Sequence, residues 1–114
     1  MKIVIDGAGE VGAHLARMLR AEANEITVID NDEKRLADLA ADSDVETLLG
    51  DPSSIQTLKE AGVGKADLFI AVYPYSAQEI NLVAALLAKR IGAAKVAARI
   101  NNEEFLSAEN RLLF

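Results

Sequence analysis

Three glycines near the start of the chain have the spacing of a phosphate-binding loop. Gly7, Gly9 and Gly12 fit the pattern G-x-G-x-x-G, between a β-branched run at 2–5 and a segment of helical periodicity that begins at Val11. In that context the first glycine permits a tight turn, the second lets the backbone approach a pyrophosphate, and the third allows close helix–strand packing. The amides that open the helix then point at the phosphates. The alternative is a strand-to-helix turn that uses glycine for geometry only. The candidate contacts of this loop are Gly7, Ala8, Gly9, Glu10, Val11 and Gly12.

An acid follows the second predicted strand, where a dinucleotide site has its ribose partner. Asp30 ends the run 25–30 and lies 18 positions beyond Gly12. An acid at about this distance, roughly 20 residues, accepts hydrogen bonds from ribose hydroxyls. Because it would also repel a 2′-phosphate, it favours NAD(H), or an adenine nucleotide such as ATP or ADP, over NADP. The alternative for Asp30 is the N-cap of the next helix, a role that Asn31 or Asp32 could equally fill. Asn31 is a further candidate contact.

Three other acids bear on an anionic ligand. Asp51 follows the third predicted strand and could contact the adenine side, although a turn acid before Pro52 is the alternative. Asp6 and Glu10 both raise the negative potential where a phosphate would bind. Glu10 in a first helical turn interacts favourably with the helix dipole. Asp6 stands at a strand end that is normally apolar, and two interpretations remain open: it weakens anionic ligands, or it accepts hydrogen bonds from loop amides.

The elements that must position these residues alternate between short β-rich runs and longer helical segments. Two capping boxes, Ser53–Gln56 and Ser76–Glu79, predict helix starts, and Gly62 and Gly92 predict helix ends. Such alternation predicts an α/β fold of Rossmann type: a doubly wound parallel sheet in a three-layer α/β/α arrangement, formed by residues 1–114 as one domain. The predicted strands are 2–5, 25–30, 45–49, 68–72 and 95–100, and 102–114 is predicted as a last amphipathic helix.

Composition excludes several classes of function. The 114 residues contain 18 acidic and 12 basic side chains and no cysteine, for a net charge of −6. Without cysteine there is no disulfide scaffold, Cys-ligated zinc or thiol nucleophile. An acidic surface without basic clusters disfavours nucleic acid and anionic lipid. No apolar stretch reaches the roughly 20 residues that span a bilayer. We therefore expect a soluble cytoplasmic domain.

A series of short motifs follows in a set order along the chain. The segments are 1–12 apart from position 6, Val28-Ile29-Asp30 with Asp32-Glu33, Leu49-Gly50-Asp51, 58–62, 66–72, Asn81-Leu82 and Ala98-Arg99-Ile100. In this order they resemble the TrkA N-terminal domain, also called the KTN or RCK (regulator of K⁺ conductance) domain. The pairs Ala61-Gly62, Ala66-Asp67 and Ala71-Val72 distinguish this family from ordinary dehydrogenases.

The resemblance implies a cytoplasmic regulatory module of a Trk/Ktr-type potassium uptake system that is not an enzyme. Such domains bind NAD(H) or ATP/ADP, assemble into dimers and rings, and transmit the nucleotide state to a membrane pore subunit at the inner face of the membrane. Family members continue into a linking helix and a second lobe, so this chain is expected to be a fragment of a longer subunit. By motif, Gly7, Gly9, Gly12, Asp30 and Asp51 carry over as nucleotide contacts, with Val72 beside them. Arg99 becomes a candidate phosphate partner, with an ordinary salt bridge as its alternative.

This sequence departs from the family pattern at three places. Asp6 replaces a small or apolar residue, and Pro52 replaces a more flexible small residue. The segment 73–75, Tyr-Pro-Tyr, stands where a Thr-Asn-Ser-type turn is common. Nucleotide contacts from that segment are therefore not expected by analogy.

Two competing functions remain. The first is the cofactor half of an NAD-dependent oxidoreductase, which needs a catalytic acid or base and a substrate pocket. No Tyr-x-x-x-Lys pair supports it, because Glu79 stands four residues after Tyr75, and the only histidine, His14, is expected on a helix surface. The second is an assembly module that has lost its ligand. It draws on the apolar segment 80–91, which fits either a core helix covered on both sides or a subunit interface.

Overall fold

The computed structural model describes residues 1–74 and 78–100, in which strands and helices alternate along the chain. The strands are β1 (Lys2–Asp6), β2 (Glu25–Asp30), β3 (Glu46–Leu49), β4 (Leu68–Ala71) and β5 (Lys95–Ala98). The helices are α1 (Glu10–Ala21), α2 (Glu33–Asp42), α3 (Ile55–Glu60) and α4 (Gln78–Ile91), and a short 3₁₀ turn lies at Val63–Lys65.

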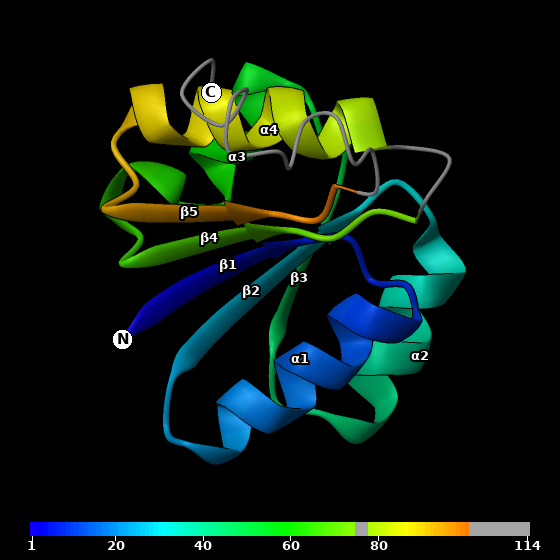
Figure 1. Ribbon diagram of the computed structural model, residues 1–114. Coiled ribbons are helices and arrows are strands. Elements are labelled where there is room, and N and C mark those ends of the chain that lie inside the picture. Colours follow the sequence, from blue (N-terminus) through cyan, green and yellow to red (C-terminus); the bar gives the residue numbers. More distant parts are fainter. Residues whose placement is uncertain (75–77, 101–114) are drawn as a thin grey trace.

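All four strand pairs are parallel, and the sheet order is β3-β2-β1-β4-β5. The chain builds the sheet outward from β1 to β3, returns to the other side of β1 with β4, and continues to β5. The connection therefore changes direction between β1 and β4. In open α/β sheets this switch point, at the carboxyl ends of the strands, is where ligands bind. In Figure 1 these ends lie on the right.

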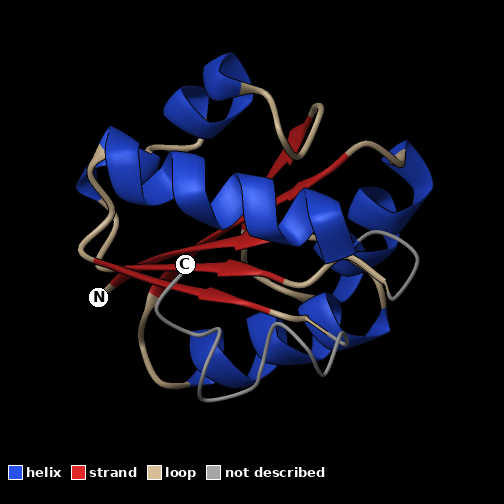
Figure 2. Cartoon of the chain, turned by 45° about the horizontal axis from the view of Figure 1, so that its top comes forward, coloured by secondary structure: helices blue, strands red, loops and turns tan. Residues whose placement is uncertain are grey.

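Helices cover both faces of the sheet, as the three-layer prediction requires. α1 and α2 pack on one face, and α3 and α4 pack on the other (Figures 1 and 2). β1 supplies both cores, because successive strand side chains point to opposite faces. Ile3 and Ile5 belong to the cluster under α1 and α2, whereas Val4 belongs to the cluster under α3 and α4. By the same alternation, the Asp6 side chain lies on the α3–α4 face.

Side-chain caps begin α2 and α3, with one correction to the predicted positions. Asp32 caps α2, because its side chain accepts hydrogen bonds from the backbone N–H groups of Lys34 and Arg35. The cap of α3 is Ser54 and not Ser53, so the predicted box Ser53–Gln56 is wrong by one residue. The hydroxyl of Ser53 instead donates to Asp51.

The predicted helix ends and strands agree with the structure to within two residues. Gly62 and Gly92 take positive φ angles, +83° and +134°, just beyond α3 and α4. β2 has its predicted bounds, β1 is one residue longer than predicted, and β3, β4 and β5 are one or two residues shorter. The predicted helix 102–114 and the Ser76 end of the second capping box lie outside the described residues.

The buried residues of α4 are small ones, with Leu87 and Ile91 partly buried against the same core, while two of its large residues are exposed. Its buried residues are Asn81, Ala84, Ala85 and Ala88, while Val83 and Leu86 are 45% and 47% exposed. Within the described residues, α4 is therefore covered on one side only, and not on both sides as one of the two alternatives predicted. No helix in residues 1–74 or 78–100 combines the length and the apolar character that crossing a membrane requires.

Candidate functional site

The glycine loop joins β1 to α1 at the switch point, and its first and third glycines are required by close packing. Gly7 has a φ angle of +124°, its N–H donates to the carbonyl oxygen of Ile29, and a side chain there would meet the backbone of Val72 and Tyr73 at 3.1 Å. A Cβ at Gly12 would overlap the carbonyl oxygen of Gly7. These two glycines let α1 approach the end of β1, as the pattern predicts.

Gly9 differs from its neighbours, because a Cβ at this position would meet no atom within 4 Å. It is the N-cap residue of α1 and makes no side-chain cap, in contrast to Asp32 and Ser54 at the starts of α2 and α3. The first backbone N–H groups of α1 therefore lack the side-chain acceptor that the other two helices have. A helix N-terminus of this kind carries donors and a positive partial charge that favour an anion.

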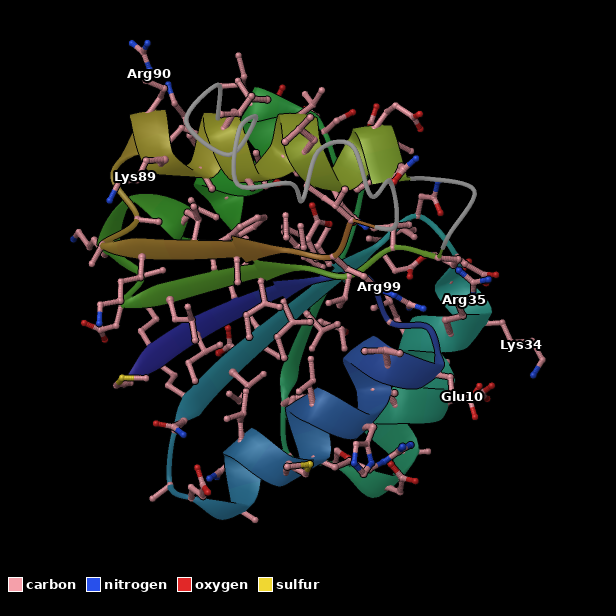
Figure 3. The ribbon with its side chains drawn as sticks, in the orientation of Figure 1. Glu10, Lys34, Arg35, Lys89, Arg90 and Arg99 are labelled. Atoms are coloured by element: carbon pink, nitrogen blue, oxygen red, sulfur yellow. The ribbon has the colours of Figure 1, made fainter. Side chains whose placement is uncertain are left out.

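A cavity of about 260 Å³ opens in front of this helix start. Arg99, which follows β5, lies on the opposite wall and extends toward the glycine loop (Figure 3). The cavity thus combines a guanidinium group with the end of a helix dipole, two features that bind phosphate. Glu10 and Val11, both exposed, stand at its edge. Its lining residues are Gly9, Glu10, Val11, Val72, Pro74 and Arg99.

Asp30 ends β2 as predicted, but its side chain is fully buried. One carboxylate oxygen accepts a hydrogen bond from the backbone N–H of Ala8 at 2.7 Å, and the other accepts from the N–H of Asp32 at 2.9 Å. Arg35 lies 3.8 Å from the carboxylate. The carboxylate therefore braces the glycine loop. The alternative role of helix cap is excluded, since Asp32 caps α2.

Asp6 is also fully buried, and neither of its carboxyl oxygens has a hydrogen-bond partner. The interpretation that it binds loop amides is therefore wrong. Burial, and then the negative charges of Asp30 and Asp51, raise the pKa of Asp6 to about 8. Below that pH the group is mainly protonated and neutral, so at neutral pH it adds little to the negative potential at the site.

The remaining predicted contacts lie at the same edge of the sheet with different exposures. Asn31 and Asp51 are exposed, and Asp51 accepts hydrogen bonds from the N–H and hydroxyl of Ser53, as a turn acid does. Val72 is 7% exposed and packs near Gly12.

Two residues shape the site that sequence reasoning did not assign to it. The side-chain amide of Asn81, 1% exposed, accepts from the N–H of Tyr73 at 2.7 Å and donates to the carbonyl oxygens of Tyr73 and Arg99, both at 3.0 Å. Tyr73 is 5% exposed, and its hydroxyl accepts from the N–H of Asn31 at 3.2 Å. Asn81 is the only polar residue in the segment 80–88, and this was the available signal for it. Nothing local signalled that Tyr73 points inward.

The parallel order β3-β2-β1-β4-β5, with helices on both faces and a glycine loop at the switch point, defines a Rossmann-type α/β protein. Within that class, the chain belongs to the TrkA-N family, because the TrkA-N domain model matches residues 3–112. The Trk system potassium uptake protein TrkA of Haemophilus influenzae is 40% identical over 113 residues, which are 98% of this chain and 24% of that protein. A TrkA homolog of Archaeoglobus fulgidus is 40% identical over 106 residues, 93% of this chain and 23% of that protein.

The chain thus spans about a quarter of the length of these relatives. Among solved structures, the GsuK channel bound to NAD matches with a TM-score of 0.78 at 18% identity, over 97% of this chain and 20% of that chain. This likeness shows the shared fold.

Proposed function

We propose that this chain is a regulatory domain that binds an adenine nucleotide at the carboxyl edge of its sheet, with NAD(H) as the favoured ligand and ATP or ADP as the alternative. The observation that carries the proposal is the uncapped start of α1, which opens on a cavity with Arg99 on the other side. The pyrophosphate would lie against Gly9 and the first turn of α1. The GsuK channel, which shares this fold and is bound to NAD, also supports the proposal.

Each predicted contact has a role in this arrangement. Gly7 and Gly12 shape the loop, Gly9 gives the backbone access to the phosphates, and Arg99 neutralises their charge. The adenosine ribose would lie at the end of β2, beside Asp30 and Asn31. Asp51, after β3, would face the adenine side. Ala8, Glu10, Val11 and Val72 would line the path of the ligand.

The proposed role of binding is coupling and not chemistry. The relatives named as potassium uptake proteins support a partner in a membrane potassium transporter, on its cytoplasmic side. The exposed Val83 and Leu86 on α4 support contact with further copies, as a dimer or ring. A nucleotide would change the relative orientation of such copies by no more than its difference in affinity for the two arrangements. An oxidoreductase would need a catalytic group here, and His14 is exposed on α1.

A binding titration tests the proposal. The 114-residue chain would be titrated with NADH, NAD, ATP, ADP and NADPH, by calorimetry and by NADH fluorescence. We expect saturable binding of NAD(H) or an adenine nucleotide, and weaker binding of NADPH because of Asp30. Gly9→Ala should lower the affinity by about ten-fold, because its methyl group enters the space of the pyrophosphate.

The matched control is Gly64→Ala, because a Cβ there meets only ordinary contacts at 3.6 Å or more. It should leave the affinity unchanged. If Gly9→Ala and Gly64→Ala bind as wild type does, the helix start is not the phosphate site. If no nucleotide binds but the chain self-associates in sedimentation, the assembly module without a ligand is the correct function.

A further inference from the structure

The side chain of Tyr73 runs across the carboxyl edge of the sheet. Its backbone follows β4, and its hydroxyl reaches the backbone N–H of Asn31, which follows β2. In the sheet, β1 lies between these two strands. The side chain therefore passes over the end of β1, at the switch point, with only 5% of Tyr73 exposed.

A bound dinucleotide would need the same space. In doubly wound folds the ribose of its adenosine half lies at the end of β2, and its pyrophosphate lies at the start of α1. Here Asp30, the predicted ribose partner, has no exposed surface, and both its oxygens already accept backbone hydrogen bonds. Burial of the Tyr73 hydroxyl, and then the charges of Asp30 and Asp6, raise its pKa.

The phosphate half of the crevice is open by comparison. The cavity of about 260 Å³ lies between Gly9 and Arg99, on the β4–β5 side of the glycine loop. Figure 3 shows Arg99 directed toward this loop, while Lys34 and Arg35 lie at the start of α2. One half of the crevice is thus filled by the protein's own side chain, and the other is available to a ligand.

The tyrosine can leave this position without unfolding its loop. Asn81 holds the backbone of Tyr73 on both sides, through the N–H at 2.7 Å and the carbonyl oxygen at 3.0 Å. The side chain, in contrast, is held at its hydroxyl, which accepts from the Asn31 N–H and also interacts with the Asp30 carboxyl group. Rotation about the side-chain bonds would break these hydroxyl contacts and expose the ring, while the contacts of Asn81 would keep the backbone in place.

We infer that Tyr73 occupies the adenosine half of the crevice and sets the affinity for adenine nucleotides. The ligand must displace the hydroxyl from the Asn31 N–H before its ribose reaches Asp30, whereas a phosphate group alone finds its half open. This inference rests on the proposed nucleotide-binding function. Because only the open molecules bind, the apparent affinity is the affinity of the open form multiplied by the fraction of molecules that are open.

The test compares three ligands on three forms of the 114-residue chain. ADP, NADH and inorganic pyrophosphate would be titrated by calorimetry into the wild type, Tyr73→Phe and Tyr73→Ser. Tyr73→Ser should bind ADP and NADH about ten-fold more tightly, and Tyr73→Phe by a smaller factor of about three, since it loses the hydrogen bond but keeps the ring. The affinity for pyrophosphate should stay within about two-fold of wild type in both variants, because its half of the crevice is open already.

Phe69→Leu is the control for loss of a buried aromatic ring, because Phe69 lies fully buried under α3 and α4, away from the crevice. We expect Phe69→Leu and Tyr73→Ser both to lower the melting temperature. Phe69→Leu should not raise the affinity for any of the three ligands. Binding of ADP only by Tyr73→Ser, with none by wild type, would also support the inference.

Three outcomes would overturn it. If the wild type binds ADP and Tyr73→Ser binds it no more tightly, Tyr73 does not control the crevice, while the proposed function stands. If the affinity for pyrophosphate rises in Tyr73→Ser by the same factor as the affinity for ADP, Tyr73 does not act on the adenosine half alone. If none of the three forms binds any ligand, the inference and the proposed function fail together.

Discussion

The two ends of the sheet hold their charged groups in opposite ways. At the amino end, Arg17 pairs with Asp42 at 3.2 Å and Arg20 pairs with Asp44 at 2.7 Å, and all four side chains are exposed by more than a third. The hydrogen bonds from Arg17 and Ser43 hold the pKa of Asp42 below its ordinary value. At the carboxyl end, two carboxyl groups are fully buried, those of Asp6 and Asp30.

The larger cavity is at the amino end. It has a volume of about 380 Å³ and is lined by residues that include Arg20, Asn24 and Asp44, while the cavity beside the glycine loop measures about 260 Å³. Exposed ion pairs in water contribute little to stability and need no further explanation. A buried carboxyl group is unfavourable unless something compensates it, and such groups concentrate at functional sites. Buried carboxyl groups therefore distinguish the candidate site from the amino end, whereas cavity volume does not.

The largest expected effect on the free energy of unfolding is at Asp6, a buried residue at the carboxyl end of the sheet. Asp6→Asn should raise the free energy of unfolding by about 4 kcal/mol at pH 7, because the wild type must keep a carboxyl group protonated in its core. The folded pKa, about 8, lies above the ordinary value of 3.8. The stability of the wild type is therefore fully present below about pH 4, falls as the pH rises toward 8, and levels off above it.

Urea unfolding followed by circular dichroism at pH 5, 7 and 8 would measure this difference. The gain in Asp6→Asn should grow with pH over that range, by about 3.5 kcal/mol in total. A gain of the same size at every pH would mean that Asp6 is ionised in the folded protein or exposed to water.

The second effect separates two glycines of the same loop. Gly12→Ala should lower the free energy of unfolding by about 3 kcal/mol, because its Cβ would overlap the carbonyl oxygen of Gly7 and the backbone must shift. Gly9→Ala, whose Cβ meets nothing, should cost about 1 kcal/mol or less, the usual loss at an N-cap. Thermal unfolding of both variants checks this. Equal losses would show that the two glycines have the same role.

The smallest effect is expected at the amino end. Asp44→Asn should change the free energy of unfolding by about 0.5 kcal/mol or less, because the Asp44 side chain is 91% exposed. Arg20 also keeps its hydrogen bond to the backbone oxygen of Asp44. Urea unfolding at low and high salt would measure it, and added salt should reduce the difference further. If Asp44→Asn lowered the free energy of unfolding as much as Gly12→Ala does, the two ends of the sheet would not differ in their contribution to stability.

Most of the fold could be predicted from the sequence, because its signals are local. Apolar runs such as 68–71 indicate buried strands, and glycines at 62 and 92 indicate helix ends, since these residues depend mainly on their own neighbours in the chain. The bounds of four strands shifted by one or two residues. The cap of α3 moved from Ser53 to Ser54, because the Ser53 hydroxyl is bonded to Asp51 in the preceding turn.

The site could be predicted less completely. The positions of the glycine loop, Asp30, Asp51, Val72 and Arg99 at one edge followed from the parallel alternation of strands and helices. The exposure of the groups did not follow, because burial depends on which side chains from other elements cover them. Asp30 looked available to a ribose, and only the packing of Ala8, Asp32 and Tyr73 around it shows that it is enclosed.

The sequence by itself determined the order of elements, the family and the edge of the sheet where a ligand would bind, because these depend on periodicity, glycine spacing and strand polarity. Only the tertiary structure decided which groups at that edge are buried, which are charged, and which side chain covers the end of β1. Asp6 is a neutral acid at pH 7 because burial raises its pKa, and the Tyr73 side chain reaches over the end of β1 to accept a hydrogen bond from Asn31, 42 positions away in the chain. Both facts depend on distances between elements that are remote in the sequence, which no local pattern records.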